Sequence, residues 1–168
     1  MAIEFKIRLA NSADAADLAD IHQRSWHFAY GNCVSTDILK KHTDRFPMIW
    51  EGMVQNNTDI HYSIEADNNT VGFFTIMPAR DADLDKSVGE LVGLYLAPDY
   101  IGLGLGRRAM DAIKQMLSHR GYQHISLWVL SENYRAKAFY EKSGFRADGF
   151  QKDSGLLDIK EERYIFSF

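Results

Sequence analysis

Apolar residues recur along the chain with two periods, which predict an alternation of strands and helices. Between residues 3 and 9, apolar side chains alternate with charged ones, a pattern typical of a half-buried strand. Similar runs predict further strands, most of them bounded by polar residues, glycine or proline. The predicted strands comprise residues 3–9, 60–66, 70–77, 91–96, 125–130, 145–150 and 159–168.

Apolar residues spaced by three or four positions predict helices in most of the remaining segments. The predicted helices comprise residues 12–30, 35–39, 48–57, 106–119 and 133–143. In the first of them, Leu18, Ile21 and Phe28 fall near one face, so we expect that face to be buried. Gly31 follows this helix and is expected to end it in the left-handed conformation.

Polar segments between these elements predict turns and loops. Asn11 or Ser12 is expected to cap the first helix with its side chain. Residues 67–69 read Asp-Asn-Asn, which tolerate positive φ, so they predict a hairpin between two strands. Residues 78–87 are polar and contain three aspartates, which indicates a solvated loop. An alternative interpretation is that this acidic loop attracts a cationic substrate.

The order of elements predicts a mixed sheet. Strands 91–96 and 125–130 are joined by the helix at 106–119, so we expect them to be parallel neighbours with a right-handed connection. The other strands should be largely antiparallel. We therefore predict an α/β (α+β) fold in which a mixed, mostly antiparallel sheet has helices on both faces. The length of 168 residues suits a single domain, 1–168.

Composition narrows the class of protein. With 46% hydrophobic and 25% charged residues, the chain resembles an ordinary globular protein. The net charge of −4 argues against nucleic acid or an anionic membrane as partner. Cys33 is the one cysteine, so the chain forms no internal disulfide, and no stretch has the length of a membrane span. A cytoplasmic location is the expectation.

A glycine-rich turn joins the strand at 91–96 to the helix at 106–119. Gly102, Gly104 and Gly106 leave backbone N–H groups uncovered, and the first N–H groups of a helix lack partners within it. Arg107 and Arg108 add positive charge there, which suggests a bound anion such as a pyrophosphate. The spacing matches neither a P-loop nor a dinucleotide fingerprint. A turn needed only for close packing of the helix stays open as the alternative.

A second motif follows the strand at 125–130. Residues 133–145 read Asn-x-x-Ala-x-x-Phe-Tyr-x-x-x-Gly-Phe, which resembles a signature of the GNAT superfamily of N-acetyltransferases. Residues 94–106, with Pro98 and the three glycines, resemble the other signature of that family. Both motifs occur in the family's order and separation. The predicted element order extends the resemblance over almost the whole chain.

The resemblance implies that acetyl-CoA is the acetyl donor and that an amine is the acceptor, with no metal. By position, the backbone of Leu94 and Leu96 would bind the acetyl and pantetheine groups like an added strand. Asn133 would hydrogen-bond the pantetheine arm, beside which Ala136 and Phe139 would pack. The cofactor-binding residues implied in this way are Leu94, Tyr95, Leu96, Gly102, Leu103, Gly104, Leu105, Gly106, Arg107, Asn133, Ala136, Phe139 and Tyr140.

Three residues are candidates for the chemistry. Tyr140 would protonate the departing CoA thiolate as general acid, and the Leu96 N–H would stabilise the oxyanion. Glu90 begins the central strand and is the expected base, acting directly or through water. An alternative for each side chain is a purely structural role, as a buried phenol or as a charged strand end.

The acceptor pocket is less sharply indicated. Trp26, Tyr30 and Trp128 are candidate walls for a small amine, such as a polyamine or an amino-acid-like compound, although core packing is an equal alternative for Trp26. Ile101 replaces the Gln or Arg that the family usually carries before the first glycine. A catalytically silent CoA-binding module and an acetyltransferase of protein or peptide amines stay open, and a homodimer is possible by resemblance.

Overall fold

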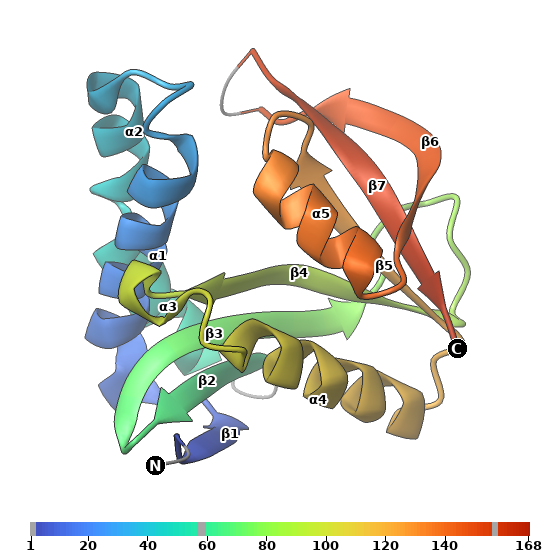
Figure 1. Ribbon diagram of the computed structural model, residues 1–168, viewed down its shortest axis with the longest axis horizontal. Helices are drawn as coiled ribbons and strands as arrows, with labels where there is room; N and C mark the ends of the chain where they lie inside the picture. The colour runs from blue at the N-terminus through green and yellow to red at the C-terminus, as the bar shows by residue number, and fades with distance from the viewer. Residues whose placement is uncertain (1–2, 57–59, 156–157) are drawn as a thin grey trace. The chain divides into compact units, whose positions relative to one another are not determined.

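A computed structural model describes residues 3–56, 60–155 and 158–168 (Figure 1). Its strands are β1 (Phe5–Leu9), β2 (His61–Ala66), β3 (Asn69–Pro78), β4 (Val88–Leu96), β5 (His124–Leu130), β6 (Arg146–Asp153) and β7 (Lys160–Ser167). Its α-helices are α1 (Ala15–Tyr30), α2 (Thr36–Thr43), α3 (Phe46–Asn56), α4 (Leu105–His119) and α5 (Tyr134–Lys142). Two short 3-10 helices, η1 (Ser12–Asp14) and η2 (Pro98–Tyr100), complete the described elements.

The strands form a seven-stranded sheet in the order β1-β2-β3-β4-β5-β7-β6. The pairs β1–β2, β2–β3, β5–β7 and β6–β7 are antiparallel, and β4 and β5 are parallel. The predicted mixed, mostly antiparallel sheet is therefore confirmed, as is the parallel pair on either side of α4.

Two compact units make up the chain. The first comprises residues 1–75 and 94–109, and the second comprises residues 76–93 and 110–168. A single domain over 1–168 stays a prediction from length.

In the first unit, the antiparallel strands β1, β2 and β3 accompany helices α1 to α3. Asp67 and Asn68 have φ of 49° and 65°, so the polar turn between β2 and β3 adopts the left-handed conformation that its residues predicted. The core between the helices and the sheet contains Leu18, Trp50 and Phe73, each no more than 2% exposed. This core places α1 and α3 against the sheet of the first unit.

The ends of α1 confirm one prediction and correct two. The Asn11 side chain accepts a hydrogen bond from the Ala13 N–H and caps the short turn η1 that precedes α1. Gly31 has φ of −60°, so the left-handed end predicted there is wrong; its N–H still bonds the His27 carbonyl in a helical manner. Phe28 is 51% exposed, because it falls outside the buried stripe that Leu18 and Ile21 define.

In the second unit, β5, β7 and β6 form an antiparallel ladder, and β4 pairs with β5 only over its first residues. Helices α4 and α5 pack on one face of this ladder. A Cβ added at Gly89 would lie 3.0 Å from Leu117 of α4, and Tyr164 of β7 donates a hydrogen bond to Glu141 of α5. Side chains of opposite parity on these strands face away from the two helices.

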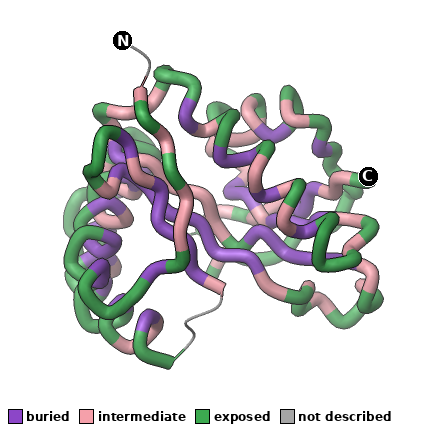
Figure 2. The backbone as a smooth tube through the Cα atoms, turned by 90° about the horizontal axis from the view of Figure 1, so that it is seen from below, coloured by how far each residue is buried: buried purple, intermediate pink, exposed green. Residues whose placement is uncertain are grey.

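Burial follows the strands, as Figure 2 shows in purple. Six consecutive residues of β3, from Val71 to Ile76, are buried, whereas β6 is exposed along its whole length. Such a continuous buried run is typical of a central strand covered on both faces. Among the helices that the structure describes, none combines the length and the apolar character needed to cross a membrane.

Candidate active site

The glycine turn of the first unit has an open backbone. Pro98 ends β4 and starts η2, and Gly102 and Gly104 then adopt φ of 86° and 80°. A Cβ added at either position would meet no atom within 4 Å. Glycine is required at these two positions by conformation and not by crowding from neighbouring side chains. The alternative interpretation, a turn needed only for close packing, therefore finds no support at Gly102 and Gly104.

Helix α4 starts directly after this turn. An i to i−4 hydrogen bond runs from the Arg108 N–H to the Gly104 carbonyl at 3.2 Å. The N–H groups of Leu105, Gly106 and Arg107 thus come before the first i to i−4 hydrogen bond of the helix. They can donate hydrogen bonds to an anion. The side chain of Leu105 is buried, which anchors the first turn, and Arg107 is exposed.

Arg108 has partners in the N-terminal strand. Its guanidinium carbon lies 4.2 Å from the centre of the Phe5 ring, and Nη1 donates to the Ile3 carbonyl at 3.3 Å. Arg108 therefore contacts that strand and also adds charge near the helix start. Arg107 and Arg108 are both exposed at this turn.

The backbone of β4 offers a strand edge. In the second unit, β4 and β5 pair at Val88–His124, Gly89–Ile125 and Glu90–Ser126. Both strands continue beyond these pairs, but the described residues 91–93 of β4 do not pair with β5. In the first unit, the Ala97 N–H bonds the Val71 carbonyl of β3, so by alternation the Leu96 N–H and C=O point away from β3. An extended ligand can add to such an edge.

The neighbours of this edge lie in the first unit. The Ser25 hydroxyl of α1 donates to the Leu96 carbonyl at 2.9 Å and so joins the end of β4 to α1. Tyr95 points into the core instead, where its ring lies 4.6 Å from His22 and 5.1 Å from Phe73. Leu94 and the exposed Leu103 complete the predicted cofactor segment here.

Helix α5 of the second unit carries the other predicted cofactor residues. Asn133 is its N-cap, and its Oδ1 accepts a hydrogen bond from the Ala136 N–H at 3.2 Å. Its side-chain amide is thus oriented by the cap, with its NH₂ group as the possible donor to a ligand. Phe139 and Tyr140 follow, with ring centres 5.5 Å apart; Tyr140 is 9% exposed and also packs against Phe145.

Glu90, the predicted base, is held by Arg80. Its Oε2 accepts from the Arg80 backbone N–H and Nε at 3.2 and 3.0 Å, and its Oε1 accepts from Arg80 Nη2 at 2.7 Å. The Glu90 side chain is 4% exposed, and that of Arg80 is 57% exposed. These bonds raise the pKa of Arg80.

The acidic loop between β3 and β4 is not merely solvated. Arg163 of β7, only 3% exposed in its side chain, donates to Asp81, Asp83 and Asp148 at 3.3, 2.7 and 2.7 Å. The hydrogen bond to Asp83, followed by those to the other two carboxylates, holds the pKa of Arg163 above its ordinary value, and the same bond lowers the pKa of Asp83. The loop is therefore bound to the sheet of the second unit.

Trp128 stands at the centre of this arrangement. Its indole N–H donates to Asp81 at 2.9 Å, and the Lys152 amine lies 4.0 Å from the centre of its ring. Trp128 pairs directly with Arg163 across the ladder between β5 and β7, so both face away from α5. Its prediction as a pocket wall is consistent with this half-exposed position among charged groups.

Trp26 and Tyr30, the other predicted pocket walls, belong to α1 in the first unit. Their rings lie 5.5 Å apart, and Trp26 also contacts Phe46 and His22. The Trp26 Nε1 atom is buried and has no hydrogen-bond partner within the described part of the chain. Core packing therefore accounts for the Trp26 ring but leaves its indole N–H as a donor.

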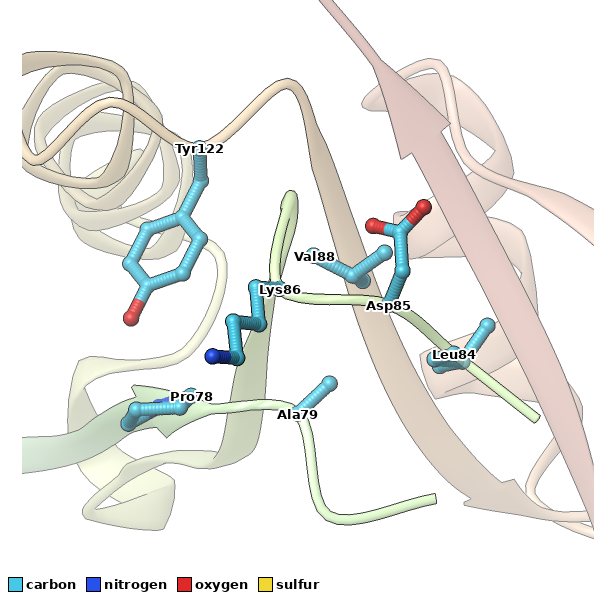
Figure 3. Close-up of a pocket in the computed structure, with 7 residues that line it drawn as sticks. All are labelled: Pro78, Ala79, Leu84, Asp85, Lys86, Val88 and Tyr122. Carbon is cyan, nitrogen blue, oxygen red and sulfur yellow. The ribbon is translucent and has the colours of Figure 1, made fainter. Parts of the chain in front are cut away.

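A separate cavity of about 380 Å³ lies in the second unit, lined by Pro78, Ala79, Leu84, Asp85, Lys86, Val88 and Tyr122. Figure 3 shows the Lys86 amine and the Tyr122 hydroxyl on one side of it and the Asp85 carboxylate on the other. None of the predicted site residues lines this cavity. In residues 3–56, 60–155 and 158–168, no group of His, Cys, Asp or Glu has a metal-binding arrangement.

Comparison with known proteins identifies the class. The family model described as Acetyltransferase (GNAT) family matches residues 15–145. The spermidine N(1)-acetyltransferase of Thermoplasma acidophilum is 24% identical over 166 residues, which cover 95% of this chain and 99% of that protein. The chain belongs to the GNAT family of acetyltransferases. It is an acetyl-CoA-dependent N-acetyltransferase.

Solved structures share this fold. The PaiA N-acetyltransferase from Thermoplasma acidophilum, solved in complex with coenzyme A, has a TM-score of 0.80 at 20% identity and covers 98% of this chain and 99% of its own. A putative acetyltransferase from Salmonella typhimurium, solved with its cofactor acetyl-CoA, has a TM-score of 0.69 at 18% identity, with 98% and 94% covered.

Sequence reasoning missed Arg80, Arg163 and Asp148. Each acts through a partner that is distant in sequence: Arg163 pairs with Asp81, 82 positions away. No local signal marked Arg163, because it follows Lys160, Glu161 and Glu162 in a charged run that is typical of an exposed strand end.

Proposed function

We propose that this enzyme transfers the acetyl group of acetyl-CoA to a primary amine of a small cationic molecule, of the polyamine or amino-acid-like class. The observation that carries the proposal is the charge around Trp128. Carboxylates outnumber basic side chains in this group, five to three. The carboxylates belong to Asp81, Asp83, Glu90, Asp148 and Glu161, and the basic side chains to Arg80, Lys152 and Arg163. Such a surface attracts a substrate with several amino groups. The similarity to a spermidine N(1)-acetyltransferase over 95% of the chain supports the same class.

The chain's own residues suit the donor. The open glycine turn and the start of α4 would bind the pyrophosphate through the N–H groups of residues 102–107, with Arg107 as an added charge. The backbone of Leu94 and Leu96 would bind the pantetheine arm and the acetyl group. On α5, Asn133 would donate its amide, and Ala136 and Phe139 would pack along the arm. Leu103, Leu105 and Tyr95 would contribute backbone and packing to the same segment.

Transfer of the acetyl group requires three tasks from the protein. The Leu96 N–H would stabilise negative charge on the thioester oxygen as the amine attacks the carbonyl carbon. Tyr140 would give its proton to the sulfur when the C–S bond breaks, and the amine would supply a replacement proton. A base must take the remaining proton, because an alkyl ammonium has a pKa of about 10 and is not a nucleophile.

Glu90 is the base that the sequence predicts, but its ion pair with Arg80 argues against that role. One arginine occupies both Glu90 carboxylate oxygens through three hydrogen bonds, and the side chain is 4% exposed, so little of the carboxylate is accessible to an amine. We infer that Glu90 orients Arg80 and the start of the acidic loop. Trp26, Tyr30 and Trp128 would contact the acceptor as pocket walls. A cytoplasmic location and a homodimer stay predictions from the sequence.

The first experiment measures thiol release from acetyl-CoA with polyamines, amino acids, aminoglycosides and short peptides, for the wild type and Tyr140→Phe. We expect turnover with a polyamine or a diamino compound and a loss of about 10²-fold in kcat in the variant, the size of a missing general acid. Binding of CoA, followed by thermal shift, should persist in both proteins.

Tyr134→Phe is the matched control, because Tyr134 lies on the same helix and is 73% exposed. It should keep wild-type turnover. Absence of turnover with every amine, while CoA still stabilises the protein, would instead favour a CoA-binding module. Turnover with peptides alone would overturn the small-molecule class.

A further inference from the structure

Glu161 of β7 occupies a position that the assigned chemistry does not use. It pairs with Leu130 at the C-terminal end of β5 and with Lys152 of β6. Directly paired residues project to the same face of a sheet, so Glu161 shares a face with Trp128 and Arg163. Tyr164, of opposite parity on the same strand, contacts α5 on the other face.

Glu90 also projects to the face of Glu161. It pairs with Ser126 of β5, and Ser126 has the same parity as Trp128 and Leu130 along that strand. Among the described residues of the second unit, β4 and β5 do not pair beyond Glu90 and Ser126. Glu161 therefore lies beside the C-terminal end of β5, beyond the residues at which β5 pairs with β4. Asn133 and the start of α5 follow this end of β5 in the chain.

The carboxylates on this face differ in their partners. Asp81, Asp83 and Asp148 are bound by Arg163, and Glu90 is bound by Arg80. Arginine donors thus occupy oxygens of all four of these carboxylates. Glu161 instead forms an ion pair with Lys152, at a longer distance of 3.7 Å, and the Glu161 side chain is 25% exposed.

We propose that Glu161 is the general base that removes a proton from the acceptor amine. This assignment rests on the proposed function and deepens it. The amine nitrogen would form a bond to the carbonyl carbon as the C–S bond breaks. Of the two protons that the ammonium loses, one would leave through the Glu161 carboxylate to water. The other would replace the proton that Tyr140 gives to the sulfur, so that the sum is one amide, one thiol and one released proton.

The electrostatic surroundings of Glu161 agree with this role. Burial raises its pKa above the ordinary value, as does the charge of Glu90, whereas Lys152 and Arg80 oppose that rise. Arg163 lies two positions away on the same strand, and its guanidinium forms ion pairs with Asp81, Asp83 and Asp148. A carboxylate with a raised pKa is a stronger proton acceptor at neutral pH than one with the ordinary value.

The test compares Glu161→Gln, Glu90→Gln and Glu162→Gln, using acetyl-CoA and spermidine over a range of pH. Glu162 is the matched control: it is the next residue, projects to the opposite face and pairs with Lys137 at 2.7 Å. We expect Glu161→Gln to lose about 10²-fold or more in kcat and to lose the fall of kcat/KM at acidic pH. Glu162→Gln should match the wild type. CoA should stabilise all variants equally in thermal shift.

Lys152→Met gives a second readout. Removing this cation should raise the pKa of Glu161 further and move the acidic limb of the kcat/KM profile to higher pH. A merely structural role for Glu161 would leave that limb in place.

Three results would overturn the assignment. They are wild-type kcat in Glu161→Gln, a rise only in the KM for spermidine, and loss of the acidic limb in Glu90→Gln alone. If the wild type acetylates no amine of the panel, the proposed function fails and the base assignment fails with it. If the wild type is active and Glu161→Gln equals it, only the base assignment fails.

Discussion

Arg163 and Asp83 form a fork-to-fork ion pair between positions 80 residues apart in the chain. Two guanidinium nitrogens donate to the two carboxylate oxygens, at 2.8 and 2.7 Å. The third nitrogen, Nε, donates to Asp148, and Nη1 also reaches Asp81, which accepts the Trp128 indole N–H. One buried arginine thus fixes the acidic loop and orients the aromatic side chain beside it.

Replacing Arg163 should destabilise the fold strongly. Arg163→Met leaves three carboxylates without their cation, and we expect the free energy of unfolding to fall by about 3 kcal/mol, measured by urea denaturation. Arg163→Lys keeps the charge but not the fork, so its loss should be smaller. The exposed Lys41→Met on α2 serves as control, with a change within about 0.5 kcal/mol. Equal stability of Arg163→Met and the wild type would contradict this account.

This network shows which features the sequence could not predict. Strand periods, caps and turn residues act locally, so the order of elements and the positive φ at Asp67 and Asn68 followed from neighbouring residues. The partners of Arg163 and Glu90 depend on strand register and on the path of a loop, which no local pattern contains. The acidic loop was therefore predicted as solvated, although it is bound.

Local signals also failed where two outcomes were close in energy. Gly31 permits a left-handed helix end but does not require it, and the chain continues in a right-handed conformation there. Phe28 fits a helical stripe by spacing, yet a large apolar side chain at the edge of a stripe often remains exposed. By contrast, the turn predicted at Gly102 and Gly104 is present, with positive φ at both glycines, and its role in binding a pyrophosphate stays a prediction.

His22 should make stability depend on pH. Its half-buried ring stacks on Phe46, with ring centres 3.9 Å apart, and its Nδ1 accepts the Trp50 indole N–H at 3.2 Å. Burial lowers the pKa of His22 to about 3. Between that value and about 6.5, the unfolded chain binds the extra proton, so stability should fall as the pH drops, with a slope of up to about 1.4 kcal/mol per pH unit.

The measurement is urea denaturation between neutral and acidic pH. His22→Asn should lower stability overall but flatten the slope, because the unfolded state then gains no proton at that position. His119→Asn, at the exposed end of α4, should keep the wild-type slope. An unchanged slope in His22→Asn would show that His22 is not buried in the neutral form.

Gly104→Ala should weaken CoA binding by more than its effect on the fold. At φ of 80° a Cβ is strained, and it would also stand beside the N–H groups that receive the pyrophosphate. We expect the Kd for CoA to rise about tenfold, close to the loss of one charge-assisted hydrogen bond. Gly121→Ala is matched in strain, with φ of 88° and open space around it, and should leave the Kd unchanged. Equal Kd values for both variants would remove the glycine turn from the CoA site.

Ile101→Arg should tighten CoA binding. Ile101 precedes Gly102 in extended backbone and is half-buried, so a longer basic side chain there would add one charge near the pyrophosphate. The Kd should fall by about fivefold at low salt and by less at high salt, as for an exposed ion pair. Ile101→Leu is the control and should change neither value. Weaker binding of the arginine variant, measured by titration calorimetry, would contradict the placement of the pyrophosphate.

The central claim is that this chain moves an acetyl group from CoA to the nitrogen of a small cationic amine. Its most direct test is mass spectrometry of the products after incubation with isotopically labelled acetyl-CoA and spermidine. The account predicts one labelled acetyl group on the polyamine and an equal amount of free CoA. Label found only as acetate, or retained on CoA while the protein is saturated with it, would contradict the account.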